Sequence, residues 1–343
     1  MSATSQGDDA ATIRRGVFQA LGLALALAAA LAVMWWLRSL ILLLFAAILL
    51  AILLRSLSRP FVRWLHLGPR AGVLIVVLLA LFGLTLFAGL LGNRVLSEIT
   101  SLTQQLPNAL ADFGNWLGLA DIEAWIAQNL QGQMDAMSLI GELSGATMWM
   151  INGLIGFLLV VSGGLFIALN PRTYETGFLA LVPPKPRPRA QQVLHDLGRA
   201  LKYWLLGQLV AMICVAIPTA IGLVLLDVPT PYALAFLAGL LEFIPYVGPV
   251  LSAIPAIAVA FAESPLAAVW VGLLYFGVQQ LEAVLLIPVI QRQTVNLPPA
   301  VTVFSVVAFG VVLGPMGVVL GAPLTVVAIT LLRNLWSDPD AAS

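Results

Sequence analysis

Long apolar runs separated by short polar stretches dominate this chain. Several runs reach the roughly 20 residues that a helix needs to cross the hydrocarbon core of a bilayer. A backbone inside lipid must satisfy its own polar groups, which favours helices over open sheets. We therefore predict an all-α polytopic membrane protein with about 8 membrane segments. In chain order the expected segments are 17–37, 39–54, 71–92, 147–169, 203–226, 231–262, 266–290 and 300–332.

Basic residues in the connections predict the orientation, because they gather on the cytoplasmic side. Segment 55–70 carries four arginines and no acid, and segment 170–202 carries six basic residues against two acids. Both are expected to be cytoplasmic, as are the tails at 1–16 and 334–343. This orientation requires the first two segments, within the N-terminal membrane region 17–92, to form a tight helical hairpin at Arg38. One long helix there is the alternative, which would place segment 55–70 outside.

Two connections have amphipathic character. Segment 93–146 has apolar residues at helical spacing and few basic residues, so it is expected to be an external insert. It either lies on the outer surface, packs against a neighbouring subunit, or forms a solvated loop. Segment 170–202 begins with a proline-rich run and ends in one apolar helical face. It is expected to be an interfacial helix or an arm that couples two parts of the protein.

The region 203–333 is the expected transport core, because it contains two stretches that are too long for simple spans. Segments 231–262 and 300–332 would each be roughly 50 Å long as straight helices, against a hydrocarbon core of about 30 Å. A Gly-Pro pair lies near the middle of each, and proline breaks or kinks a helix. We therefore predict two re-entrant hairpins of opposite orientation, an arrangement typical of secondary transporters. With the two hairpins, the connection 291–299 is expected to be cytoplasmic. With eight plain spans it would be external.

The broken helix centres and nearby polar residues are the candidate binding site, because freed amides and carbonyls there can hold ions or polar solutes. Glu242 and Glu282 are costly in lipid, so a role in proton or sodium binding is a reasonable expectation. A packing contact of Glu282 with a glutamine is the alternative. The motif GVVLG occurs on both sides of Pro315 and indicates close helix packing or a thin, mobile tip. The candidate residues are Glu242, Pro245, Tyr246, Gly248, Pro249, Gln279, Gln280, Glu282, Gly314, Pro315 and Gly317, with Gln208 in support.

Composition excludes several functional classes. The chain is 61% hydrophobic and only 9% charged, whereas soluble domains carry about a quarter charged residues. A formal net charge of zero gives no basic footprint for nucleic acid. The two histidines, His66 and His195, fall in connections, and no metalloprotease or phosphate-loop motif occurs. We expect no enzyme activity, no cofactor and no resident metal. The single cysteine, Cys214, is expected to be a buried apolar residue.

Three segments resemble the AI-2E family of bacterial membrane proteins: EFIPYVGPVLSAIP at 242–255, QQLEAVLLIPVIQ at 279–291 and GPMGVVLGAP at 314–323. The resemblance implies a permease of the bacterial inner membrane with two opposed hairpins, as in elevator-type carriers. It also suggests a homo-oligomer, with the pentamer as the family's assembly. It also implies export of an autoinducer-2-like signal, or sodium or lithium exchange for protons. Relatives often have an asparagine shortly after the position of Glu282, where this chain has Ala283 and Val284.

These observations lead to one main expectation and two alternatives. The chain is expected to be a secondary carrier that moves a small solute or ion across the bilayer by alternating access. An ion channel would need a continuous polar lining, which the apolar spans do not show clearly. A non-transporting membrane scaffold is the third possibility.

Overall fold

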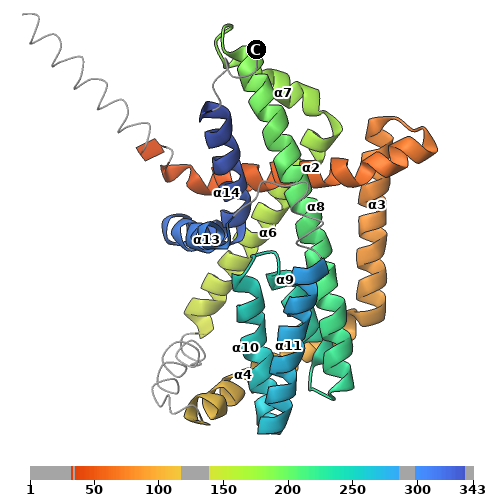
Figure 1. The fold of residues 1–343 in the computed structure, drawn as a ribbon, viewed down its shortest axis with the longest axis vertical. Helices are drawn as coiled ribbons and strands as arrows, with labels where there is room; N and C mark the ends of the chain where they lie inside the picture. Colours follow the sequence, from red (N-terminus) through yellow and green to blue (C-terminus); the bar gives the residue numbers. More distant parts are fainter. Residues whose placement is uncertain (1–31, 34, 117–138, 286–297, 337–343) are drawn as a thin grey trace, which may run out of the picture. The chain divides into compact units, whose positions relative to one another are not determined.

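The computed structural model describes residues 32–33, 35–116, 139–285 and 298–336, and all regular structure in these ranges is helical (Figure 1). The chain divides into two compact units, residues 1–45 and 46–343. The helices are α2 (Arg38–Leu65), α3 (Pro69–Phe87), a π-helical turn η1 (Ala88–Gly92), α4 (Asn93–Trp116), α6 (Leu139–Leu169), α7 (Pro171–Ala180), α8 (Arg187–Leu225), α9 (Pro231–Leu241), α10 (Val247–Glu263), α11 (Pro265–Leu285), α13 (Pro299–Leu313) and α14 (Pro315–Trp336).

Several of these helices are apolar and long enough to cross a membrane, which confirms the all-helical, multi-span prediction. The described residues contain 5 such helices, or 6 if the bent pair α6–α7 counts as one span. The prediction of about 8 segments is not reproduced as such. Most of the first expected segment, 17–37, and most of the connection 291–299 lie outside the described residues.

The tight turn expected at Arg38 is absent, and that prediction is wrong. The backbone N–H of Leu37 bonds the carbonyl of Val33, and that of Ile41 bonds the carbonyl of Leu37. Helical hydrogen bonding therefore runs past the expected reversal, and α2 continues to Leu65. No glycine or proline stands beside Arg38, so extending the helix is the simplest way to satisfy the backbone in an apolar run.

The second unit contains a junction of α2, α3 and α6. Ala51, Val73 and Ala168 are buried together there, one from each helix. Gly164 of α6 faces Leu50 and the backbone carbonyl of Ala47 so closely that a side chain at Gly164 would require a shift. Small residues at these positions let the three helices approach closely, as is usual between membrane helices.

The predicted amphipathic helix after residue 93 is present as α4, which continues from α3 through the π-helical turn η1. It packs against α9 and α10 of its own chain. The rings of Phe113 and Trp116 contact the ring of Phe261 on α10, with centroids 5.4 and 5.5 Å apart. For α4, packing against its own chain therefore replaces the expectation of a solvated loop. Residues 117–138 of the predicted insert lie outside the described residues.

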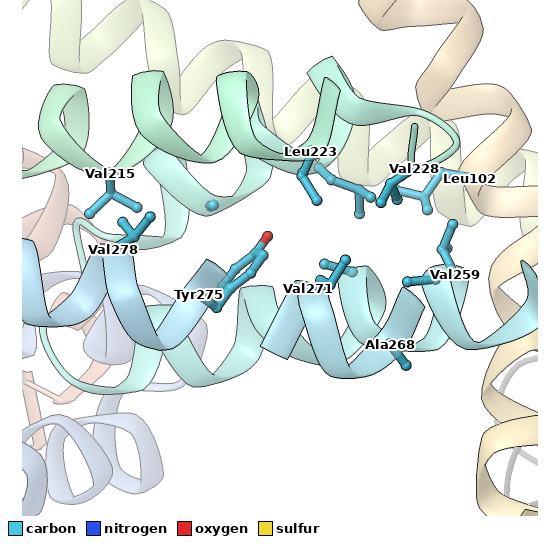
Figure 2. Packing of buried hydrophobic residues seen from close by; sticks show 13 residues of the cluster. Leu102, Val215, Leu223, Val228, Val259, Ala268, Val271, Tyr275 and Val278 are labelled. Carbon is cyan, nitrogen blue, oxygen red and sulfur yellow. The ribbon is translucent and has the colours of Figure 1, made fainter. Parts of the chain in front are cut away.

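The largest apolar cluster joins α8, α9, α10 and α11, and includes Leu102 of α4 (Figure 2). Leu223 and Val271 are fully buried in it, from α8 and α11 respectively. Helix α8 has 39 residues, so it is roughly 58 Å long. It contacts α7, α9, α11 and α14. The amphipathic half of segment 170–202 and the expected span at 203–226 thus form one continuous helix. This single helix connects the four helices that it contacts.

Candidate functional site

The first predicted hairpin is broken between α9 and α10, at residues 242–246. Tyr246 adopts φ 66° and ψ −36°, which is rare for a residue with a side chain. The N–H of Val247 bonds the carbonyl of Pro245 at 2.8 Å. This is a γ-turn centred on Tyr246, a strained conformation of the kind that clusters at functional sites and costs on the order of 1–3 kcal/mol.

The first Gly-Pro pair is not the break itself, which corrects the sequence prediction. Gly248 and Pro249 lie in the first turn of α10, where proline costs no helical hydrogen bond because the first N–H groups have no partner. Gly248 instead allows a close approach. A Cβ there would overlap the carbonyl oxygen of Leu241, so the start of α10 rests directly on the end of α9.

Two carboxyl groups meet at this break. Glu242 caps the end of α9 and is only 2% exposed. Its carboxyl group lies near that of Glu282 on α11, and Gln279 lies close enough to act on both carboxyl groups. Gln279 and Glu282 are three residues apart, so they share one face of α11. Tyr246 lies close enough to Glu282 for the charge of that carboxyl group to act on the tyrosine hydroxyl.

Gln208 of α8 completes the cluster. It is buried, and its side-chain amide donates a hydrogen bond to the backbone carbonyl of Glu242. That carbonyl is freed by the end of α9 and would otherwise be unpaired inside an apolar core. In the structure Gln208 therefore binds the backbone of Glu242 rather than the side chain of Glu282.

The chemistry of this cluster follows from charge. Two carboxylates in contact inside a low-dielectric core repel strongly, so both cannot be ionised unless a cation lies between them. The described charged side chains provide no cation here, and one oxygen of Glu242 has no hydrogen-bond partner. A shared proton or a small metal cation satisfies both conditions. Gln280 follows Gln279 on α11 and therefore points in a different direction. Its side chain is exposed, so it does not join the cluster.

The second break lies between α13 and α14, where the Gly-Pro pair stands as predicted. Gly314 ends α13 with φ 73°, and Pro315 begins α14. Gly317 rests against α13 so closely that a Cβ would overlap the carbonyl oxygen of Phe309. Within the described ranges, no hydrogen bond or ion pair joins this break to Glu242 or Glu282. The structure thus groups the candidates at the first break with α11, and leaves those at the second break apart.

Sequence reasoning missed Thr219, and it left open whether Tyr275 hydrogen-bonds a solute or only fills space. The hydroxyl groups of Thr219 on α8 and Tyr275 on α11 are buried without a hydrogen-bond partner among the described residues. Figure 2 shows the Tyr275 hydroxyl directed away from its own helix, into the cluster shared with α8. Buried hydroxyls without partners are rare, so these two are candidate sites for water. A threonine next to Pro218 within an apolar run was the available signal for Thr219.

Glu98 of α4 fixes the start of α9. Its Oε2 atom accepts hydrogen bonds from the backbone N–H groups of Tyr232 and Ala233, both at 2.9 Å. These are unpaired donors of the first turn of α9, so Glu98 caps that helix from another element. The Nε of Arg94 lies 3.7 Å from Glu98, and its guanidinium covers the ring of Tyr232. These contacts attach α4 to the start of α9.

We expect Glu98→Gln to lower the free energy of unfolding by about 1 kcal/mol, because the charge that stabilises the N-terminus of α9 is lost. The measurement is the unfolding temperature of the purified protein in detergent. Asp112→Asn is the matched control, since Asp112 is exposed on the same helix. Equal unfolding temperatures for the two variants would show that the cap has no stabilising role.

Comparison of the sequence with known proteins finds a matching family and several relatives. A model of the AI-2E family transporters matches residues 24–337. "Putative transport protein YueF" of Bacillus subtilis (strain 168) is 25% identical over 315 residues, which cover 85% of this chain and 84% of that protein. "Putative permease PerM" of Escherichia coli (strain K12) is 28% identical over 340 residues, covering 94% and 95%. The names of these relatives describe transport.

Proposed function

The chain belongs to the AI-2E transporter family, and we propose that it is a secondary transporter that moves a small solute or a cation across the bacterial inner membrane by alternating access. The nearness of the carboxyl groups of Glu242 and Glu282 carries this proposal. A site that needs a proton or cation to neutralise it, placed beside a strained helix break, can couple ion binding to a change in the position of the hairpin.

The lengths of the helices support two re-entrant hairpins. Helices α9 and α10 are roughly 16 and 26 Å long, and α13 is roughly 22 Å long, so none of these three crosses a core of about 30 Å alone. Helix α14, at roughly 33 Å, is long enough. In this proposal α9–α10 and α13–α14 enter from opposite sides, and their breaks face the transported solute or ion.

Exchange of sodium or lithium for protons is the second candidate function, and the carboxyl pair favours it. Two carboxyl groups and two glutamine amides offer oxygen ligands that suit either a proton or a small alkali cation. An autoinducer-2-like solute is proposed from the family alone. Saturable exchange would support either carrier, whereas single-channel currents would support a pore, and unchanged ion and solute distribution would support a scaffold.

We expect Glu282→Gln to slow ion-coupled transport by roughly 10- to 100-fold, the effect of losing a hydrogen bond to a charged group. The measurement uses proteoliposomes that contain a trapped pH dye and receive an inward sodium or lithium gradient. Glu263→Gln is the matched control, because Glu263 is an exposed carboxylate at the end of α10. If the pH inside the vesicles changes as fast with both variants as with the unsubstituted protein, Glu282 is not the coupling group.

Orientation and assembly complete the proposal. We propose that segments 55–70 and 170–202 are cytoplasmic, together with a cytoplasmic C-terminus, a cytoplasmic connection at 291–299 and a homo-oligomer. Labelling of Gln293→Cys from each side, in a Cys214→Ala background, tests the hairpins, since an external position 293 would exclude them. Light scattering of the purified protein tests the oligomer.

A further inference from the structure

Four cationic side chains from three helices of the second unit lie close enough for their charges to act on one another. Arg55 and Arg59 are on α2, Arg172 is near the start of α7, and Lys202 is on α8. Arg55 lies close enough to Arg59 and Arg172 to interact with their charges, and Lys202 interacts with Arg59. Residues separated by more than 100 positions thus form one cluster of positive charge, which we call the basic junction.

The basic junction has no acidic partner in the described part of the chain. The ion pairs there are Arg94 with Glu98 and His195 with Asp196, and neither involves a member of the junction. Cations at close range repel each other, and more strongly where burial excludes water. Arg55 and Lys202 are only partly exposed. A cluster of this kind is stabilised when an anion binds between its members.

The junction lies where an apolar helix ends. The chain bends by 91° between α6 and α7, next to Asn170. Arg70 at the start of α3 donates a hydrogen bond of 2.8 Å to the side-chain oxygen of Asn170, which ties this corner together. Tyr174 and Phe178 are exposed on α7. Cations beside exposed aromatic rings at the end of a span are typical of the boundary between hydrocarbon and lipid headgroups.

An apolar groove of about 420 Å³ lies along the last turns of α2. Its described lining is Pro60, Phe61, Trp64 and Leu65, and Pro60 directly follows Arg59 in the chain. Trp64 is 86% exposed, which would be costly in water and is favourable against lipid. Positive charge beside an apolar groove is complementary to an amphiphile with an anionic head and a hydrocarbon chain.

We propose that the basic junction binds the phosphate headgroup of an anionic phospholipid, whose acyl chain lies along the Pro60–Leu65 groove. Arginine forms paired hydrogen bonds with phosphate oxygens, and lysine contributes a point charge. Basic pockets between membrane helices on the cytoplasmic side bind such headgroups in the same way. The lipid then joins α2 and α7 to α8, the helix that carries Gln208.

The test measures lipid binding to the full chain in detergent, by native mass spectrometry and by the unfolding temperature. Phosphatidylglycerol and cardiolipin are the anionic probes, phosphatidylcholine is the neutral probe, and inorganic phosphate is the soluble probe. We expect both anionic lipids to bind and to raise the unfolding temperature of the unsubstituted protein, since a ligand of the folded state stabilises it. Equal binding of phosphatidylcholine would overturn the proposal. Inorganic phosphate that displaces the lipid completely at millimolar concentration would assign the junction to a soluble anion instead.

The double variant Arg59→Gln/Lys202→Gln is expected to bind anionic lipid more weakly by on the order of tenfold. The control is Lys185→Gln/Arg333→Gln, which removes two exposed charges outside the junction. In lipid-free detergent the junction variant should unfold at the same or a higher temperature, because its substitutions relieve repulsion. If it misfolds, Arg59→Lys supplies a second measurement, with an expected loss of lipid affinity but retained charge. Equal lipid affinity in the junction and control variants would overturn the proposal.

Discussion

Gly248→Ala is expected to abolish transport and to lower the free energy of unfolding by on the order of 1–3 kcal/mol, the range for overpacking a tight site. A Cβ at position 248 would overlap the backbone carbonyl oxygen of Leu241. Backbone cannot rotate away as a flexible side chain can, so α10 must move relative to α9. That movement separates Glu242 at the end of α9 from the γ-turn at Tyr246.

The measurement is coupled flux in proteoliposomes together with the unfolding temperature in detergent. Gly272→Ala is the matched control: Gly272 is on α11, and a Cβ there meets nothing within 4 Å. That substitution adds the same methyl group to a helix and should leave flux unchanged. If Gly248→Ala transports as fast as Gly272→Ala, the close approach of α10 to α9 is not required for function.

The carboxyl site shows how far sequence reasoning reaches. The cost of an acid in an apolar run selects Glu242 and Glu282, and the three-residue spacing adds Gln279 to the same face of α11. What the sequence lacks is the pairing of α9 with α8 and of α10 with α11, which sets the partner of each side chain. Gln208 therefore binds a backbone carbonyl, a partner that no side-chain pattern indicates. The coupling role of this site stays a prediction.

The Gly-Pro pairs located the second helix break correctly and the first one incorrectly. The difference lies in which residue takes the positive φ at each break. At Gly314-Pro315 glycine supplies the positive φ and proline begins the next helix, so both residues act at the break itself. At the first break Tyr246 takes the positive φ, which residue propensity argues against. Gly248-Pro249 then falls inside α10. Tertiary packing overrode local preference there, and a local motif could not locate the turn.

Prediction was weakest for the N-terminal helices and for long-range contacts. The charge pattern suggested a reversal at Arg38, but hydrogen bonding continues through the helix, because an apolar backbone gains nothing by stopping there. The capping of α9 by Glu98 joins positions far apart in the chain. Neither hydrophobic periodicity nor charge counts contain such a pairing, since both describe one element at a time.

Gly317→Ala should have nearly the same consequences as Gly248→Ala, if the two hairpins are structural counterparts. A Cβ at position 317 would overlap the carbonyl oxygen of Phe309, as one at Gly248 would overlap that of Leu241. Each glycine lies within the first turn of the second helix of its pair. We expect loss of flux and a loss of stability on the order of 1–3 kcal/mol.

Gly310→Ala provides the matched control for the second pair of helices, measured by the same flux and unfolding assays. Its new Cβ would lie 2.7 Å from Cγ2 of Val318, a side chain that can change its rotamer rather than force the backbone apart. The expected effect is therefore smaller. A Gly317→Ala variant that loses stability but keeps full flux would assign this glycine to packing alone, because the second break would then tolerate distortion that the first cannot. Equal loss of flux from Gly248→Ala and Gly317→Ala would mean that both breaks take part in transport, although no hydrogen bond joins them in the described residues.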